Sequence, residues 1–158
     1  MRKEECAAFR DDTVLNRYWL PVIEAAALLA ERNPEGAIER LEVARPYELG
    51  QPSGFLVLSI APMFPVYLRG SAFLQAGKGT EAEAQFQIIV QHAGLIQNYP
   101  VGFLARIGQA RAAALKGDKQ KAAGLFNDCL LRWKNADTGL PLLKQIRGEA
   151  HKLEIETE

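Results

Sequence analysis

The sequence predicts an all-α protein made of three antiparallel helical hairpins and one closing helix. Over most of the chain, apolar residues recur at spacings of three and four, as the buried side of a helix requires. In addition, a small residue, a second small residue twelve positions later and a large apolar residue four positions after that occur three times. Small residues let two helices approach closely, and the large residue fills the gap on the facing side. The three copies are Ala25, Ala37 and Leu41, then Gly70, Ala82 and Phe86, then Ala110, Ala122 and Phe126.

Length and helix signals give the boundaries. With 158 residues, of which 48% are hydrophobic, the chain is long enough for one well-buried domain and short for two. We expect one domain with hairpins at about 13–45, 63–93 and 101–135 and the closing helix at about 140–154. The closing helix is apolar on one side and charged on the other, as a cap over stacked repeats must be.

The first hairpin begins at Asp12 or Thr13, either of which offers an oxygen to cap the free amides of a helix. Pro21 either kinks this helix or marks its true start, because proline is tolerated only in the first turn. Asn33 caps the partner helix, with Pro34 at its first position. The apolar stripe expected to face the core in the first helix is Leu15, Tyr18, Trp19, Val22, Ile23, Ala26, Leu29 and Ala30.

Tight turns close the other two hairpins. The turn at residues 77–79 contains two glycines, and Thr80 with Glu83 then matches a capping box, in which each side chain binds the amide of the other residue. Asp118 is expected to cap the second helix of the third hairpin.

The connection between residues 44 and 63 is long, and loops of this length are usually functional or packed. Its apolar residues, Tyr47, Phe55, Leu56, Leu58 and Ile60, favour packing.

Composition argues against several functions. The 19 basic and 19 acidic residues balance, so the chain lacks the strong positive field of nucleic-acid binders and anionic-membrane binders. Two long uncharged runs, 49–68 and 84–105, contain prolines and many amides, so we expect no membrane insertion. The amino terminus also lacks the apolar core of a secretory signal.

Neither a cofactor nor a metal is expected. His92 and His151 have no second ligand at helical spacing. Cys129 lies at helical spacing from Phe126 and Trp133, which favours a buried thiol over a reactive one. The sequence supplies no constellation of a nucleophile and a base, so we expect that the protein is not an enzyme.

The repeated spacing, together with LARIGQARAAALKGDKQKAAGLFNDCLLRW at residues 104–133, resembles the tetratricopeptide repeat. The resemblance implies a right-handed α-solenoid whose first helices line a concave face. The copies are 45 and 40 residues apart, whereas the family period is about 34. Pro21, Val66 and Arg106 stand where the family has a tryptophan, so the stacking is expected to be irregular.

The segments DDTVLNRYWLPVI, ARPYELG, PVYLRGSAFL and LLRWKNADTGLPLLKQIRGEAHKL are similar to the carboxyl-terminal repeat region of a group of bacterial serine/threonine protein kinases and regulators. This similarity implies a repeat module linked to a signalling domain. The sequence itself contains no glycine-rich loop after a strand, no HRD and no DFG, which a kinase requires. We expect a cytoplasmic location, or an extracytoplasmic one if the module belongs to a membrane-anchored kinase.

The expected function is a non-catalytic scaffold that binds a protein or peptide, in a regulatory or signalling role. Aromatic and Arg side chains supply most of the energy at such interfaces, and we expect Tyr67, Gln75 and Arg111 to make the polar contacts. By the resemblance, the concave face consists of Trp19, Val22, Phe64, Tyr67, Ser71, Gln75, Leu104, Ile107 and Arg111.

Blander interpretations remain open. Trp19 and Phe64 could instead pack under the long loop, and Arg69 and Arg106 are better explained as solvated surface charges than as binders of a carboxylate. The whole groove could be filled by the loop at residues 46–62 or by a second copy in a homodimer. A helical enzyme or small-ligand binder would need a deep pocket with perturbed titratable groups.

Overall fold

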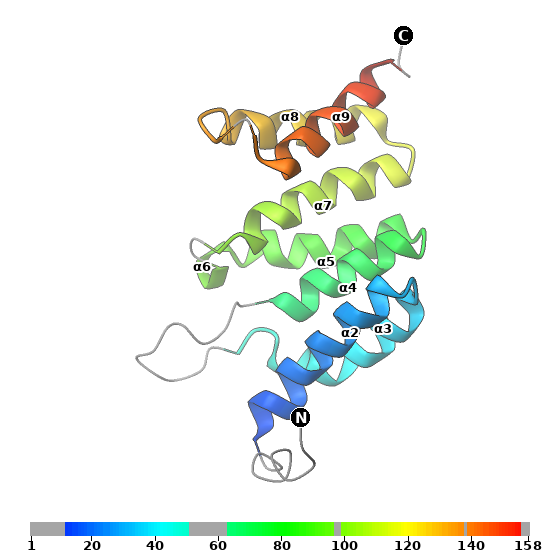
Figure 1. Ribbon diagram of the computed structural model, residues 1–158, viewed down its shortest axis with the longest axis vertical. Coiled ribbons are helices and arrows are strands. Elements are labelled where there is room, and N and C mark those ends of the chain that lie inside the picture. The colour runs from blue at the N-terminus through cyan, green and yellow to red at the C-terminus, as the bar shows by residue number, and fades with distance from the viewer. Residues whose placement is uncertain (1–11, 51–62, 97–98, 138, 156–158) are drawn as a thin grey trace.

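The computed structural model describes residues 12–50, 63–96, 99–137 and 139–155, and every regular element in these ranges is a helix (Figure 1). The prediction of an all-α protein is therefore confirmed. The elements are the π-helical turn η1 (Leu15–Trp19), α2 (Leu20–Ala30), α3 (Pro34–Leu41), the 3₁₀-helix η2 (Glu42–Tyr47), α4 (Phe64–Gln75), α5 (Gly79–Gln91), α6 (Ala93–Ile96), α7 (Val101–Leu115), α8 (Lys119–Arg132) and α9 (Pro141–Ile155).

The long helices pack against one another in chain order (Figure 1). α2 pairs with α3, α4 with α5 and α7 with α8, and each pair is joined by a tight turn. Between the pairs, α3 contacts α4, α5 contacts α7, and α9 packs on α8. α4 also contacts both α2 and α7, so the first helices of the pairs lie next to one another along the molecule.

All nine residues of the repeated spacing are buried. Leu41 is 0% exposed, while Phe86 and Phe126 are each 1% exposed. Each large residue belongs to a different one of the three apolar clusters that make up the core. The spacing pattern therefore predicts one large buried residue of each cluster.

Phe86 of α5 is held between two glycines on different helices. A Cβ atom on Gly70 of α4 would lie 2.7 Å from Cε1 of Phe86, and one on Gly108 of α7 would lie 2.5 Å from its Cζ. The ring of Tyr67 also lies 5.9 Å from the Phe86 ring, centroid to centroid. One aromatic ring thus joins α4, α5 and α7.

The three hairpins close with the same turn. Arg32, Gly77 and Gly117 all adopt the left-handed conformation, with φ of 61°, 74° and 82°. In each turn the next amide donates to the carbonyl five residues earlier, which is the Schellman arrangement at the end of a helix. These bonds are Asn33 N to Leu28 O at 2.9 Å, Lys78 N to Phe73 O at 2.8 Å and Asp118 N to Ala113 O at 3.0 Å.

Two predicted caps are confirmed and the capping box is wrong. Asn33 Oδ1 accepts from the amide of Gly36 at 3.0 Å, and Asp118 Oδ1 accepts from the amide of Lys121 at 3.1 Å. α5 instead begins at Gly79 without a side-chain cap. Gly79 lies against the end of α7, where a Cβ atom would be 3.1 Å from Ala112 O, and this close approach sets the helix start. The Glu83 carboxylate pairs with two lysines instead.

For the first helix, the structure decides between the predicted alternatives and differs from the prediction in the exposure of the apolar stripe. Asp12 rather than Thr13 caps it, because Asp12 Oδ1 accepts from the amide of Leu15 at 2.9 Å. Pro21 lies in the first turn of α2, directly after the π-helical turn. Part of the stripe expected to face the core is exposed: Ile23 at 59%, together with Ala26 and Ala30.

The long connection was predicted to pack. Its first part forms the 3₁₀-helix η2, in which Tyr47 is 40% exposed. Phe55, Leu56, Leu58 and Ile60 lie outside the described residues. Of the helices that the structure describes, none combines the length and the apolar character needed to cross a membrane.

Candidate functional site

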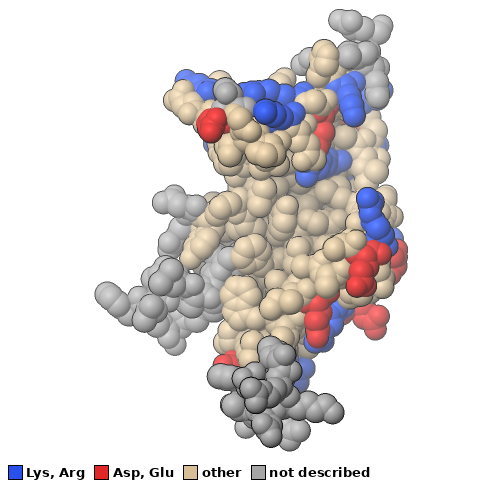
Figure 2. Space-filling view, viewed as in Figure 1, with Lys and Arg blue, Asp and Glu red and all other residues tan. Residues whose placement is uncertain are grey.

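The candidate site is the side of the molecule formed by α2, α4 and α7, which we call the first-helix face. Figure 2 shows a broad surface without Lys, Arg, Asp or Glu across the middle of the molecule, between charged regions at its end and edge. On this face the side chains of Trp19, Phe64, Tyr67 and Leu104 are each partly exposed. These four are therefore the predicted residues that can still contact a partner through apolar atoms.

Trp19 and Phe64 lie together at the amino-terminal end of this face. Their ring centroids are 6.5 Å apart, with the planes tilted by 51°. The rings of Tyr18 and Trp19 pack edge to face, with their centroids 5.4 Å apart. Tyr18 is only 4% exposed. Burial raises the pKa of Tyr18 to about 12, with the nearby Glu48 charge adding to the shift and backbone hydrogen bonding at Phe64 opposing it. Tyr18 is thus a neutral anchor at physiological pH.

Three polar residues of the predicted face, Ser71, Gln75 and Arg111, already bind groups within the chain. Ser71 Oγ donates to Tyr67 O at 3.0 Å, and Gln75 Nε2 donates to Leu29 O at 3.1 Å, which ties α4 to α2. Arg111 donates through Nε and Nη2 to the two carboxylate oxygens of Glu149, both at 2.9 Å. This bidentate geometry is the strongest that arginine and a carboxylate form. Gln75 and Arg111 therefore connect helices, and Ser71 is bound within α4.

Two predicted site residues belong to the core. Val22 is 8% exposed and Ile107 is 1% exposed, and each packs in an apolar cluster. The prediction placed them on the face through the resemblance to the tetratricopeptide repeat. In the structure α2 turns Val22 toward α3 and α4, and α7 turns Ile107 toward Phe126, so neither side chain reaches the surface.

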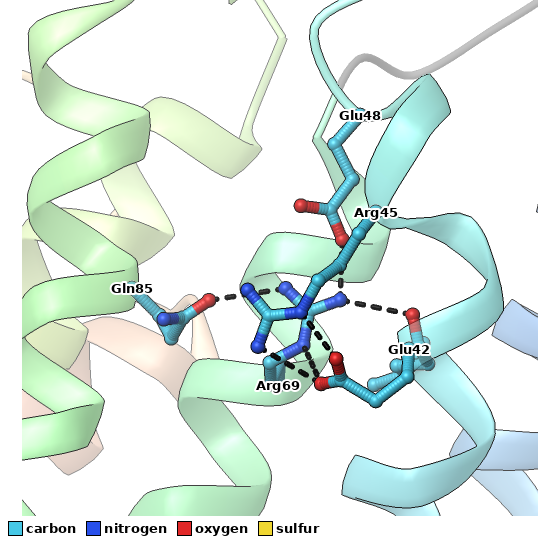
Figure 3. Close-up of polar contacts among 6 residues, drawn as sticks. Glu42, Arg45, Glu48, Arg69 and Gln85 are labelled. Carbon is cyan, nitrogen blue, oxygen red and sulfur yellow. Dashed lines mark hydrogen bonds and ion pairs between the residues drawn. The ribbon is translucent and has the colours of Figure 1, made fainter.

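Arg69 of α4 is the feature that the sequence reasoning missed. It is 0% exposed, and Figure 3 shows the groups that surround it. Its Nη1 donates to Gln85 Oε1 at 3.1 Å, and its Nη2 donates to Leu41 O at 2.9 Å and to the Glu48 carboxylate. Its Nε lies 3.5 Å from Glu42 Oε1. The interpretation of Arg69 as a solvated surface charge is therefore wrong.

The surroundings of Arg69 balance its charge. Glu48 is largely buried and Glu42 is half-exposed, with side-chain exposures of 10% and 47%. Arg45 donates a hydrogen bond to Glu42, and this bond lowers the pKa of the Glu42 carboxyl. The positive charges of Arg45 and Arg69 lower it further by smaller amounts. Arg69 belongs to α4, whereas Glu42 lies in η2 and Glu48 directly follows η2. This network therefore fixes the start of the long connection against the hairpin that follows.

Cys129 matches the interpretation of a buried thiol. It is 1% exposed, and burial raises the pKa of its thiol, which disfavours the reactive thiolate. In the ranges that the structure covers, no group of three or more His, Cys, Asp or Glu could hold a metal ion. His92, which directly follows α5, has its Nδ1 2.8 Å from Ile88 O of that helix.

Comparisons with family models, with curated proteins and with solved structures give no match. The chain's own geometry therefore carries the functional argument.

Proposed function

We propose that this chain is a non-catalytic interaction module that binds an apolar segment of a protein partner on the first-helix face. One observation carries the proposal: Trp19, Phe64, Tyr67 and Leu104 remain partly exposed on a surface whose neighbouring polar side chains are bound within the chain. Aromatic side chains held rigidly on helices supply contact area at a small entropic cost.

The arrangement of helices supports assignment to the tetratricopeptide type. Three helix pairs close with the same left-handed turn, and each pair buries its small, small and large residues at corresponding positions. We infer that these pairs form one right-handed solenoid domain, closed by α9. The unequal repeat lengths are absorbed between the pairs, where η2 and α6 lie.

The partner segment should be apolar rather than acidic. Arg111, which was expected to make a polar contact with the partner, is paired with Glu149, and Arg69 is buried among carboxylates. A carboxylate approaching this face would therefore have to displace an existing ion pair. An amphipathic helix or an extended strand with large apolar side chains would instead bury the exposed edges of the aromatic rings. The similarity to repeat regions of bacterial kinases and regulators favours a regulatory role.

The test is selection of peptides from a random peptide library on the full chain. We expect selected peptides to be rich in aromatic and aliphatic residues. Replacing Trp133 by Phe leaves Trp19 as the only tryptophan, so binding can be followed by its fluorescence. Tyr67→Glu should weaken binding at least about tenfold, as loss of an interface aromatic residue does.

Leu131→Glu is the matched control, because Leu131 lies on α8 and is 67% exposed. This variant should bind as the wild type does. Tyr67→Phe, which keeps the ring and removes only the hydroxyl, should also bind, whereas Tyr67→Ala, which removes the ring without adding a charge, should bind as weakly as Tyr67→Glu. Selection of acidic peptides, or equal loss in Tyr67→Glu and Leu131→Glu, would contradict the proposal.

A further inference from the structure

α2 has the composition of a buried helix but lies at the end of the stack. Its eleven residues include one charged side chain, Glu24. It packs on η1, α3 and α4, yet Ile23 is 59% exposed and Ala26, Ala27 and Ala30 are also exposed. These four residues have the spacing of one helix side. A helix that is apolar all round is normally covered.

The opposite end of the stack is built differently. α9 buries Leu143, Ile146 and Ala150 against the helices beneath it, and its outer side carries the exposed cations Lys144 and Arg147. One end is thus closed by a charged surface, as the ends of stacked repeats usually are. The end formed by α2 has no such closure among the described residues.

The two ends also carry opposite charge. Residues 12–50 contain four Lys and Arg against seven Asp and Glu, whereas residues 119–155, to the end of α9, contain seven Lys and Arg against four Asp and Glu. Figure 2 shows Lys and Arg gathered over α8 and α9, and Asp and Glu clustered lower on the molecule. Glu31 directly follows α2 and lies on the same helix side as Ile23 and Ala27, since each is four positions from the next. Glu39 is exposed on α3.

We propose that a second copy of the chain covers the outer side of α2 with its α9 end, so that copies associate head to tail. Charge complementarity selects this occupant. Glu31 and Glu39 give the α2 end exposed negative charge, and a two-fold contact would bring two such ends of like charge together. The head-to-tail contact sets these glutamates opposite Lys144 and Arg147. Leu140, which precedes α9 and is 38% exposed, adds an apolar contact for Ile23.

A head-to-tail contact uses different patches on the two partners, so it leaves a free patch at each end of the assembly. The mass in solution should therefore rise continuously with protein concentration. It should fall as salt is raised from about 0.01 M to about 1 M, because screening shortens the range of charge attraction. This contact lies on the outer side of α2 and does not rest on the proposed function.

The test is an exchange of charge between the two ends, followed by light scattering after size exclusion. The first variant carries Glu31→Lys and Glu39→Lys, and the second carries Lys144→Glu and Arg147→Glu. Each alone has ends of like charge, and its association constant should fall at least about tenfold. An equal mixture should associate again, because the altered end of each variant complements the altered end of the other.

Glu81→Lys is the matched control, since Glu81 is exposed on α5 in the middle of the stack, and it should associate as the wild type does. Ile23→Asp should abolish association while its circular dichroism stays unchanged. Any of three results would overturn the proposal: a wild type that stays monomeric at every concentration, a dimer of fixed mass that ignores the α9 substitutions, or variants that fail to associate when mixed.

Discussion

Gly108 and Phe86 pack so closely that a Cβ atom on Gly108 would lie 2.5 Å from Cζ of the ring. Carbon atoms that are not bonded are most stable about 3.5–4.0 Å apart, so the contact exists only because Gly108 has no side chain. The two residues belong to α7 and α5, which are neighbours from different hairpins. The contact therefore holds one helix pair against the next.

Gly108→Ala should lower the free energy of unfolding by about 1–3 kcal/mol, as overpacking of a tight core does.

Phe86→Ala should lower the free energy of unfolding by about 3–5 kcal/mol, because it leaves a cavity between three helices. The double variant Phe86→Leu with Gly108→Ala should be more stable than the sum of the single changes implies, since a smaller side chain leaves room for the new methyl group. Urea denaturation of the wild type, Phe86→Leu, Gly108→Ala and the double variant measures this coupling.

The control for this cycle is Gly124→Ala. No atom outside the helix lies within 4 Å of a Cβ placed on Gly124, and alanine favours a helix by about 1 kcal/mol over glycine, so this variant should be stabilised. Additive effects in the Phe86 and Gly108 cycle would show that the two side chains do not compete for the same space.

Much of this fold follows from the sequence because small residues and turns are local signals. Ala25, Gly70 and Ala110 identified the first helices, and Asn33 and Asp118 identified two helix starts. Gly108 was missed because the spacing pattern joins residues within one hairpin, whereas Gly108 faces the next one. The unequal distances between hairpins hide that relationship in a single sequence.

The site was less predictable than the fold. Periodicity gives the side of a helix, but it does not show which polar group finds a partner. Gln75 and Arg111 lie where a partner could reach them, yet each is bound to a neighbouring helix. Arg69 sits next to Gly70 in the apolar stripe of its helix, and this position was a usable signal. A charge in a buried position requires an opposite charge nearby, and Glu42 and Glu48 in the preceding segment supply it.

Arg69→Met should destabilise the protein by about 3–5 kcal/mol, because removal of one partner leaves the largely buried Glu48 without its cation. The second substitution Glu48→Gln should restore part of this loss, since a neutral side chain no longer needs that cation. Thermal or urea denaturation measures both effects. The matched control is Arg40→Ala, which breaks the exposed ion pair with Glu24 and should cost no more than about 1 kcal/mol. Equal losses in Arg69→Met and Arg40→Ala would contradict the assignment of Arg69 as a buried anchor.

Arg32→Gly should stabilise the protein. Arg32 occupies the left-handed position that Gly77 and Gly117 fill in the other two hairpins, and a non-glycine residue there costs about 1–2 kcal/mol. Glycine loses more backbone freedom on folding than arginine does, and this offsets part of the gain. The free energy of unfolding should therefore rise by about 0.5–1 kcal/mol. Gly117→Ala, the reverse change in an equivalent turn, should destabilise by about 1–2 kcal/mol. A loss of stability in Arg32→Gly would show that the arginine side chain contributes more than the strain of its backbone costs.

Glu83 should make the stability of the third hairpin's contact with α5 depend on pH. Its carboxylate accepts from Lys116 and, at 2.6 Å, from Lys121, and these hydrogen bonds, that from Lys116 first, lower its pKa. The unfolded value for glutamate is about 4.3. Since the folded pKa is the lower one, the stabilisation is fully present above the unfolded pKa and is lost as pH falls through the folded pKa. Replacing Glu83 by Gln should therefore flatten the dependence of unfolding free energy on pH below about 5, with an effect at neutral pH of no more than about 1 kcal/mol. Glu81→Gln, two residues away on α5 and exposed, should keep the wild-type dependence. If both variants show the same slope between pH 5 and pH 3, the two lysines do not hold Glu83 in its charged form.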